Sequence, residues 1–421
     1  MARLLVIMGS GETSPTMSKV HRELFERLGP PPVPAVMLDT PFGFQENADD
    51  ISAKALAYFR ESVQRDIAVA SFRSAEDVDP LAHETTLARL RAARYVFAGP
   101  GSPSYALAQW AASRIPAVLA DKLRTGGCVT FASAAACTLG PLALPVYEIY
   151  KVGDRVRWLE GLNLMADVGL PAVVVPHFNN AEGGNHDTRY CYMGERRLSL
   201  LEALMPPSTF ILGVDEHTAC ILDLDARTAT VAGLGSVTVR RRGEMSAVPS
   251  GSTLTIDELA SLGTASGAYA VAPAPPAAVA PGSAAVGIGG APVDPFQAEV
   301  ERNEHAFDAA LRAGDAPAAV KLALELDGLL HDWSRDTLQS DQLDRARAGL
   351  RAMIVRLGEA AEVGVRDPRT VLAPFVEALL DARRHARVDG RYADADQLRD
   401  RLLAAGVEVR DTAQGTDWQL R

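Results

Sequence analysis

The chain has 421 residues and a formal net charge of −11. This length predicts two or three domains with cores large enough to need no disulfides, and the acidic balance argues against a protein built chiefly to coat nucleic acid or an anionic membrane. Its four cysteines form no CxxC pair, which favours a reducing compartment over a zinc knuckle or a disulfide framework. No apolar run reaches the roughly 18 residues of a membrane span, so we expect a soluble, cytoplasmic protein without a membrane partner.

Short apolar runs alternate with helical periodicity through the first part of the chain. Strands are predicted at residues 3–8, 34–38, 67–72 and 95–98, and helices at 17–28, 49–64 and 81–92. This order predicts an α/β domain with a doubly wound, mostly parallel sheet. Two of the strands end in loops of small residues, one carrying Glu12 and the other Gly99, Gly101 and Ser102. Ligands of open α/β sheets bind at this edge of the strands, so both loops are candidate ligand contacts.

The stretch 127–137 contains the strongest candidate for chemistry. An apolar run meets a single Ser133, and only small residues follow. This pattern is typical of a strand that turns directly into a helix and lifts a hydroxyl above the sheet edge. The backbone N–H of Ala134 could then donate to an oxyanion, together with a donor from the loop that carries Gly99, Gly101 and Ser102.

Two later segments could complete a catalytic set. Residues 144–151 are predicted as a strand carrying Glu148, and a β-branched strand ends on His177. A serine hydroxyl becomes nucleophilic when an imidazole takes its proton, and the imidazole needs a carboxylate to fix its tautomer. Ser133, His177 and Glu148 are therefore the predicted catalytic residues, with Asp154 and Asp187 as competing acids.

The polar loop that follows His177 carries His186, Asp187 and Arg189. Arg189 could bind a substrate carboxylate bidentately, whereas Glu12 could face a basic substrate group, and the spacing does not decide between them. A zinc site built from His177, His186 and Asp187 would lack the usual helical spacing. No metal and no cofactor are therefore expected.

Composition divides the chain into three parts. Residues 1–245 form the predicted α/β domain, residues 246–295 a linker rich in Ala, Pro and Gly, and residues 296–421 an all-α domain. The linker composition cannot build a packed core. Helices are predicted near 296–313, 316–331, 340–362 and 370–388, followed by a terminal segment from about residue 394.

Several N-terminal motifs resemble the dipeptidase E and cyanophycinase family of serine peptidases. Ser133-Ala134 resembles the family's GxSAGA elbow, residues 176–180 and 194–198 resemble the segment around its catalytic His, and residues 213–219 resemble its G-[IV]-D-E-x-T-A strand. The likeness runs in order over about residues 3–240. It implies the class I glutamine amidotransferase-like fold, Ser133 as nucleophile, His177 as base, a small peptide or amide substrate, and the option of a homodimer.

The elbow departs from the family pattern at two positions. Phe131 and Ala135 stand where the family has glycine. A nucleophile often sits in a strained conformation that needs room, so two hypotheses stay open. The chain is either a serine hydrolase that cleaves an amide, peptide or isopeptide bond through an acyl-enzyme on Ser133, or a catalytically degenerate ligand- or tRNA-binding protein.

The C-terminal residues 370–421 resemble the end of cysteinyl-tRNA synthetase, which closes with an "AR…AD…DT.QGT.W" pattern. The chain lacks the synthetase's HIGH and KMSKS segments, which excludes aminoacylation. The resemblance implies tRNA as a candidate partner. The locally basic face offers Arg383, Arg384, Arg387 and Arg391, and the alternative is a helical interaction module without RNA.

Overall fold

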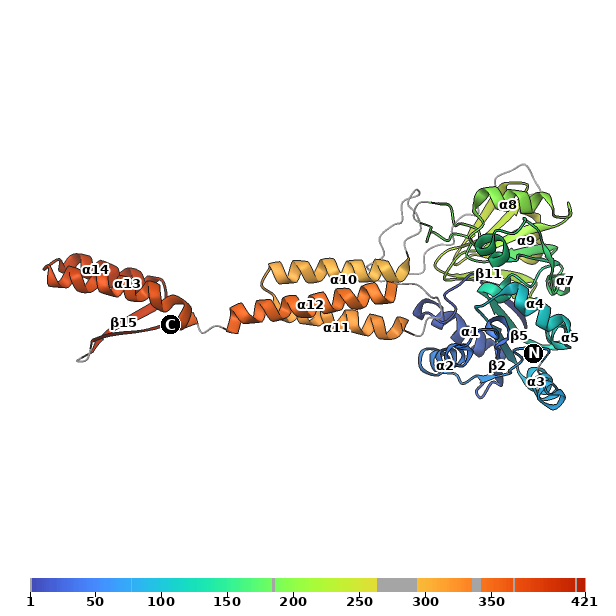
Figure 1. Ribbon diagram of the computed structural model, residues 1–421, viewed down its shortest axis with the longest axis horizontal. Helices are drawn as coiled ribbons and strands as arrows, with labels where there is room; N and C mark the ends of the chain where they lie inside the picture. The colour runs from blue at the N-terminus through green and yellow to red at the C-terminus, as the bar shows by residue number, and fades with distance from the viewer. Residues whose placement is uncertain are drawn as a thin grey trace. The chain divides into compact units, whose positions relative to one another are not determined.

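Strand β1 (Arg3–Met8) is buried on both faces because its alternate side chains enter two separate hydrophobic cores. Leu5 and Ile7 pack in the core that includes helices α3 (Pro80–Ala92), α4 (Pro103–Ala111) and α5 (Ile115–Thr125). Leu4, Val6 and Met8 pack in the core that includes α1 (Ser18–Leu28) and α2 (Ala48–Tyr58). A strand covered on both faces is apolar throughout, which is why this segment was predictable. The result is a sheet with helices on both sides (Figure 1).

The computed structural model describes residues 2–76, 78–183, 186–262, 294–334, 342–365, 368–412 and 415–420. Contacts divide the chain into two compact units, one of residues 1–300 with 328–343 and the other of residues 301–327 with 344–421. The remaining short helices before residue 262 are η1 (Pro15–Met17), η2 (Thr40–Phe42), η3 (Phe59–Val63), α6 (Ser133–Ala136), η4 (Glu148–Val152), α7 (Met165–Val168), α8 (Gly194–Ala203) and α9 (Ile256–Ser261). The remaining strands there are β2 (Ala35–Leu38), β3 (Ala68–Val69), β4 (Tyr95–Ala98), β5 (Gly127–Ala132), β6 (Leu142–Ala143), β7 (Leu159–Glu160), β8 (Ala172–Val175), β9 (Phe210–Val214), β10 (Thr218–Asp223), β11 (Thr228–Gly233), β12 (Ser236–Arg241), β13 (Glu244–Pro249) and β14 (Thr253–Thr255).

The main sheet has eight strands in the order β14-β11-β10-β1-β5-β4-β2-β3. Strands β1, β5, β4, β2 and β3 are parallel, and β10, β11 and β14 add an antiparallel edge. The predicted α/β class with a mostly parallel sheet is confirmed. A second sheet, β13-β12-β9-β8, was not predicted, and in it β8 and β9 run parallel.

Two sequence predictions need correction in this unit. The predicted strand at 144–151 is instead helical from residue 146 and continues into η4, and only Leu142–Ala143 before it is a strand. The predicted linker at 246–295 begins too early, because Val248, Ile256 and Leu259 are buried in the α/β core. Most of the predicted linker, residues 263–293, lies outside the described residues.

The predicted C-terminal helices are present as α10 (Pro295–Arg312), α11 (Ala316–Trp333), α12 (Gln342–Val365), α13 (Pro368–Val388) and α14 (Tyr392–Ala404). The chain then forms an antiparallel hairpin of β15 (Val407–Thr412) and β16 (Gly415–Leu420), which the helical pattern did not predict. Helices α13 and α14 pack beside this hairpin (Figure 1), around a small core that includes Val376, Leu402 and Trp418. No helix among the described residues is long and apolar enough to cross a membrane.

Candidate active site

Ser133 stands at the point where β5 ends and α6 begins. Its backbone is left-handed, with φ of 50°, a conformation that costs a non-glycine residue free energy and that is common at functional sites. Its Oγ lies 2.9 Å from Nε2 of His177. The turn therefore presents the hydroxyl to an imidazole, as the small-residue pattern predicted.

The bulky Phe131 does not prevent this geometry. Its side chain is buried in the helix-covered core, where its ring lies 5.6 Å from that of Trp110. Ala135, the other departure from the family pattern, donates its backbone N–H to the carbonyl of Gly99 at 3.2 Å. Both replacements are accommodated, because the phenyl ring points into the core and the added methyl leaves the backbone contact intact.

His177 follows β8 and is also left-handed, with φ of 46°. Its Nδ1 lies 2.8 Å from Oε1 of Glu216, and its backbone N–H donates to the carbonyl of Gly9 at 3.3 Å. Glu216 lies where the chain crosses from β9 of the second sheet to β10 of the main sheet. A serine, an imidazole and a carboxylate thus form one hydrogen-bonded chain.

The two ionisable partners change each other's pKa. Burial lowers the pKa of His177, but the hydrogen bond and the charge of Glu216 outweigh burial and raise it to about 9. Burial raises the pKa of Glu216, but His177 and the amide of Asn180 outweigh that effect and lower it. Glu216 is therefore held as the anion, and a carboxylate on Nδ1 leaves Nε2 of the neutral imidazole free to accept the serine proton.

The acid expected at Glu148 is not beside the imidazole. The Glu148 carboxylate accepts a hydrogen bond from the hydroxyl of Ser104 instead. Of the competing acids, Asp154 pairs with Arg157 at 3.2 Å. Asp187 pairs with Arg189 at 2.8 Å. The prediction placed Glu148 within a strand at 144–151, whereas Glu148 is the first residue of η4.

Glu216 lies within residues 213–219, which the sequence marks only as similar to the family's strand motif, so it was not predicted as the catalytic acid. The available signal was the Asp215-Glu216 pair directly after an apolar strand, because an acid at a strand end lies at the edge where ligands bind. What the sequence could not show is that this strand belongs to the same small sheet as the one that ends at His177.

The predicted oxyanion loop lies against the elbow. The carbonyl of Gly99 accepts from Ala135, and the backbone N–H of Ser102 donates to Pro41. Gly101 has φ of 136°, and a Cβ there would lie 2.0 Å from the carbonyl oxygen of Pro41, so only glycine fits. Ala134 is at the start of α6, where helical N–H groups lack intrahelical acceptors.

A cavity of about 410 Å³ opens at Ser133 and His177. Its lining combines aromatic, charged and small residues: Phe42, Gln45, Ile51, Pro100, Gly101, Tyr147, Tyr150, Lys151, Glu182, Gly183, His186, Thr188 and Tyr192. The predicted contact His186 is among them, with its Nε2 3.5 Å from the hydroxyl of Tyr150. The ring of Tyr192 stacks on that of Tyr150 at 5.1 Å.

Three predicted substrate contacts do not line this cavity. Arg189 donates to both carboxylate oxygens of Asp187 at 2.8 and 2.9 Å, and Asp187 also accepts the backbone N–H of Glu195 at the start of α8. Glu12 is 1% exposed, neither of its carboxylate oxygens has a hydrogen-bond partner among the described residues, and burial raises its pKa. No group of three or more metal-ligating side chains occurs among the described residues.

The predicted RNA contacts on α13 and just before α14 are already engaged in ion pairs. Arg383 is 4% exposed and donates to both oxygens of Asp411 at 2.9 and 2.8 Å, so its role is structural rather than that of a surface cation. Arg387 also pairs with Asp411. Arg384 and Arg391 are exposed and pair with neighbouring aspartates.

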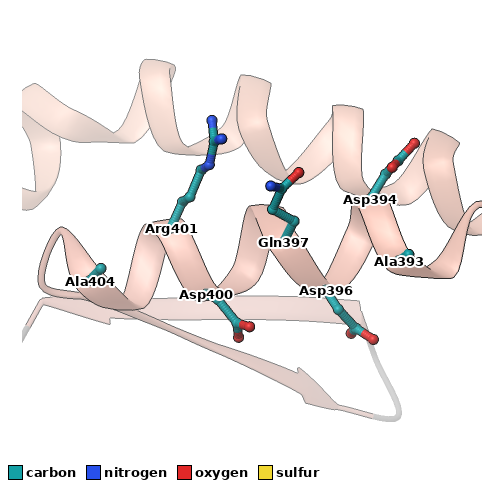
Figure 2. A pocket seen from close by; sticks show the side chains of 7 residues that line it. All are labelled: Ala393, Asp394, Asp396, Gln397, Asp400, Arg401 and Ala404. Carbon is teal, nitrogen blue, oxygen red and sulfur yellow. The ribbon is translucent and has the colours of Figure 1, made fainter.

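A hollow on α14, lined by Ala393, Asp394, Asp396, Gln397, Asp400, Arg401 and Ala404, is unsuited to a phosphate backbone. Figure 2 shows the carboxylates of Asp394, Asp396 and Asp400 along this helix, with Arg401 as the cation among the lining residues. Negative charge of this density repels phosphate. These carboxylates therefore disfavour RNA contact within the hollow itself.

The C-terminal part of the chain is similar to cysteine–tRNA ligases. The family model of the cysteinyl-tRNA ligase anticodon binding domain matches residues 369–418, which confirms the C-terminal resemblance. The cysteine–tRNA ligase of Salinibacter ruber is 37% identical over 118 residues, which cover 25% of this chain and 22% of that protein. The ligase of Micrococcus luteus is 34% identical over 159 residues, which cover 30% of this chain and 33% of that protein. The chain thus spans between about a fifth and a third of the length of these relatives.

The solved structures similar to the chain include a peptidase and a putative peptidase E. A peptidase from an acI-B1 actinobacterium has 18% sequence identity and a TM-score of 0.49, covering 61% of this chain and 97% of its own. A putative peptidase E from Listeria monocytogenes EGD-e has 14% identity and a TM-score of 0.36, covering 56% of this chain and 100% of its own.

Proposed function

We propose that the α/β unit is a serine hydrolase that cleaves an amide, peptide or isopeptide bond through an acyl-enzyme on Ser133. The observation that carries the proposal is the continuous chain from Ser133 Oγ to His177 Nε2 at 2.9 Å and from His177 Nδ1 to Glu216 Oε1 at 2.8 Å. In this role His177 takes the serine proton during attack and returns it to the leaving amine, while Glu216 stabilises the imidazolium.

The surroundings of Ser133 support this chemistry. Ala134 follows Ser133 in α6, and the loop at Gly99 contacts the same helix through the N–H of Ala135. In this proposal, backbone donors from these two segments stabilise the oxyanion. The cavity of about 410 Å³ is within the size range of small-molecule sites. It accommodates a substrate of a few residues rather than a folded protein, because the chain's own loops enclose Ser133 and His177.

A fluorophosphonate probe tests the nucleophile directly. The purified full chain should form one covalent adduct, and Ser133→Ala should form none. Ser104→Ala is the matched control, because that hydroxyl donates to Glu148 and not to an imidazole, and it should label like the wild type. Equal labelling of the wild type and Ser133→Ala would overturn the proposal and leave the degenerate, ligand-binding alternative.

Labelling of Ser133 would then justify a search for the substrate. Dipeptides, isopeptides and simple amides can be screened for amine release, with mass spectrometry of the acyl-enzyme as the direct readout. A transient mass on Ser133 equal to the acyl part of one substrate would identify the bond that is cleaved. Turnover that persists in Ser133→Ala would contradict the acyl-enzyme route.

The match of residues 369–418 to a tRNA-ligase domain favours a second activity, tRNA binding by the C-terminal unit. Because Arg383 is buried, the exposed Arg384 and Arg391 are the better candidates for phosphate contact. Replacing both with Gln should weaken binding of the full chain to tRNA and reduce its salt dependence. If the full chain does not shift tRNA in a gel even at low salt, where charge contacts are strongest, tRNA is not its partner.

A further inference from the structure

Two adjacent asparagines hold the acid of the catalytic chain from opposite ends. The carbonyl oxygen of the Asn179 side chain accepts the backbone N–H of Glu216 at 2.8 Å. The Asn180 amide donates from Nδ2 to Glu216 Oε1 at 3.0 Å. This is the same oxygen that contacts His177.

Asn180 is fully buried, with 0% of its surface exposed. Burying an amide costs free energy unless its polar atoms are hydrogen bonded, and both ends of this side chain are used. The Nδ2 end contacts Glu216, and Oδ1 accepts the backbone N–H of Glu182 at 3.3 Å. Since Glu182 lines the cavity, the amide connects the acid to the substrate-facing loop.

We infer that Asn180 is a positioning residue that holds Glu216 Oε1 on the imidazole of His177, an assignment that rests on the proposed hydrolase function. The glutamate side chain has three rotatable bonds, so holding its carboxylate against the imidazole costs rotamer freedom. A hydrogen bond from a buried amide fixes the orientation before the substrate arrives. Asn180 itself touches neither Ser133 nor the reacting atoms, so it acts through Glu216.

The neighbouring positions supply a matched pair of variants. Asn180→Asp replaces the donating NH2 with an acceptor, which leaves two carboxylates facing each other at Glu216. Asn179→Asp makes the same change but keeps the acceptor oxygen that the Glu216 N–H needs. The labelling rate of Ser133 at a fixed pH should therefore fall at least about tenfold more in Asn180→Asp than in Asn179→Asp, since a hydrogen bond to a charged group is worth more than tenfold in an equilibrium.

A double-mutant cycle separates positioning from a general loss of packing. Asn180→Leu removes the donor while keeping the branching and the number of side-chain heavy atoms, and in the otherwise wild-type chain it should reduce labelling about tenfold or more. In a Glu216→Gln background the same change should have almost no further effect, because the carboxylate that it orients is gone. Equal losses in both backgrounds would overturn the inference, since a packing defect would act regardless of residue 216.

A titration keeps this inference distinct from the proposed function. NMR of the histidine imidazoles in the full chain, with His177 assigned by its absence in His177→Gln, reports protonation without requiring activity. In Asn180→Leu the titration of His177 should move to lower pH by about one pH unit or more, because Glu216 no longer stays on Nδ1. If Ser133 is never labelled but this shift occurs, only the hydrolase proposal fails. If Ser133 is labelled and the titration does not move, only the positioning role fails.

Discussion

The exchange of Glu216 for Gln gives the sharpest test of the catalytic chain. In the folded protein the pKa of His177 rises from the ordinary 6.5 to about 9, a difference that corresponds to roughly 3 kcal/mol of preference for the imidazolium. The neutral amide of the Glu216→Gln variant cannot supply the negative charge that causes this rise. Burial then dominates, and the pKa of His177 should fall below its ordinary value.

This change has a defined effect on stability. Because the pKa of His177 is raised by folding, its contribution is complete below about pH 6.5 and is lost as the pH rises through about 9. Glu216→Gln should therefore be less stable than the wild type by up to roughly 3 kcal/mol below pH 6.5, down to the pH at which the wild-type Glu216 becomes protonated. The difference should shrink or reverse above pH 9, because a neutral amide is easier to bury than an anion.

Urea denaturation of the full chain below about pH 6.5 and above about pH 9 measures the stability difference. The rate of probe labelling at Ser133 measures the reactivity of the nucleophile. Wild-type labelling should rise with pH through about 9 as His177 becomes the free base. Glu216→Gln should lose this rise and label about 100-fold or more slowly at high pH, since the imidazolium formed during attack has no counter-charge.

Glu148→Gln is the matched control for this experiment. Its carboxylate contacts Ser104 rather than the imidazole, so its pH profiles of stability and labelling should follow those of the wild type. The reasoning would be refuted if Glu216→Gln kept the wild-type pH dependence, or if Glu148→Gln abolished it.

Three further changes test the packing around the two units. Phe131→Gly restores the residue expected at the elbow but empties a core site, so the urea midpoint should drop by an amount equivalent to about 3–5 kcal/mol; an unchanged midpoint would show that the ring is not packed. Burial raises the pKa of Glu12 above the ordinary glutamate value of 4.5. The wild type should therefore lose stability as the pH rises from 4.5 towards the raised pKa of Glu12, whereas Glu12→Gln should not. Parallel curves of melting temperature against pH for the two proteins would contradict this. Arg383→Leu should cost the C-terminal unit roughly 1–3 kcal/mol, because it removes a buried guanidinium that donates two hydrogen bonds to Asp411. Arg384→Leu at the surface should cost at most about 1 kcal/mol; equal costs by thermal melting would show that burial does not distinguish the two arginines.

Much of the α/β architecture could be predicted from local pattern alone. Strands β1, β4 and β5 are apolar at consecutive positions because helices cover both faces of the sheet, and that pattern is visible without coordinates. The turn at Ser133 was equally visible, because small residues must follow a hydroxyl that stands above a sheet edge. The C-terminal helices followed from their 3.6-residue periodicity.

The acid could not be predicted, because its place depends on which strands pair. Glu216 reaches His177 only because β8 and β9 are parallel neighbours in a second sheet, so that the segments after both strands meet at one edge. Sequence distance pointed instead to Glu148, which lies closer to Ser133 along the chain.

The sequence by itself determined the local elements of this protein: buried strands, amphipathic helices, and a serine placed at a sharp turn. These depend on the period and size of side chains that are near one another along the chain. Tertiary structure alone decided which carboxylate meets the imidazole, and that Phe131 turns into the core and leaves Ser133 accessible to its partner. Strand pairing and side-chain packing between distant segments set those contacts, and they are not encoded in any single stretch.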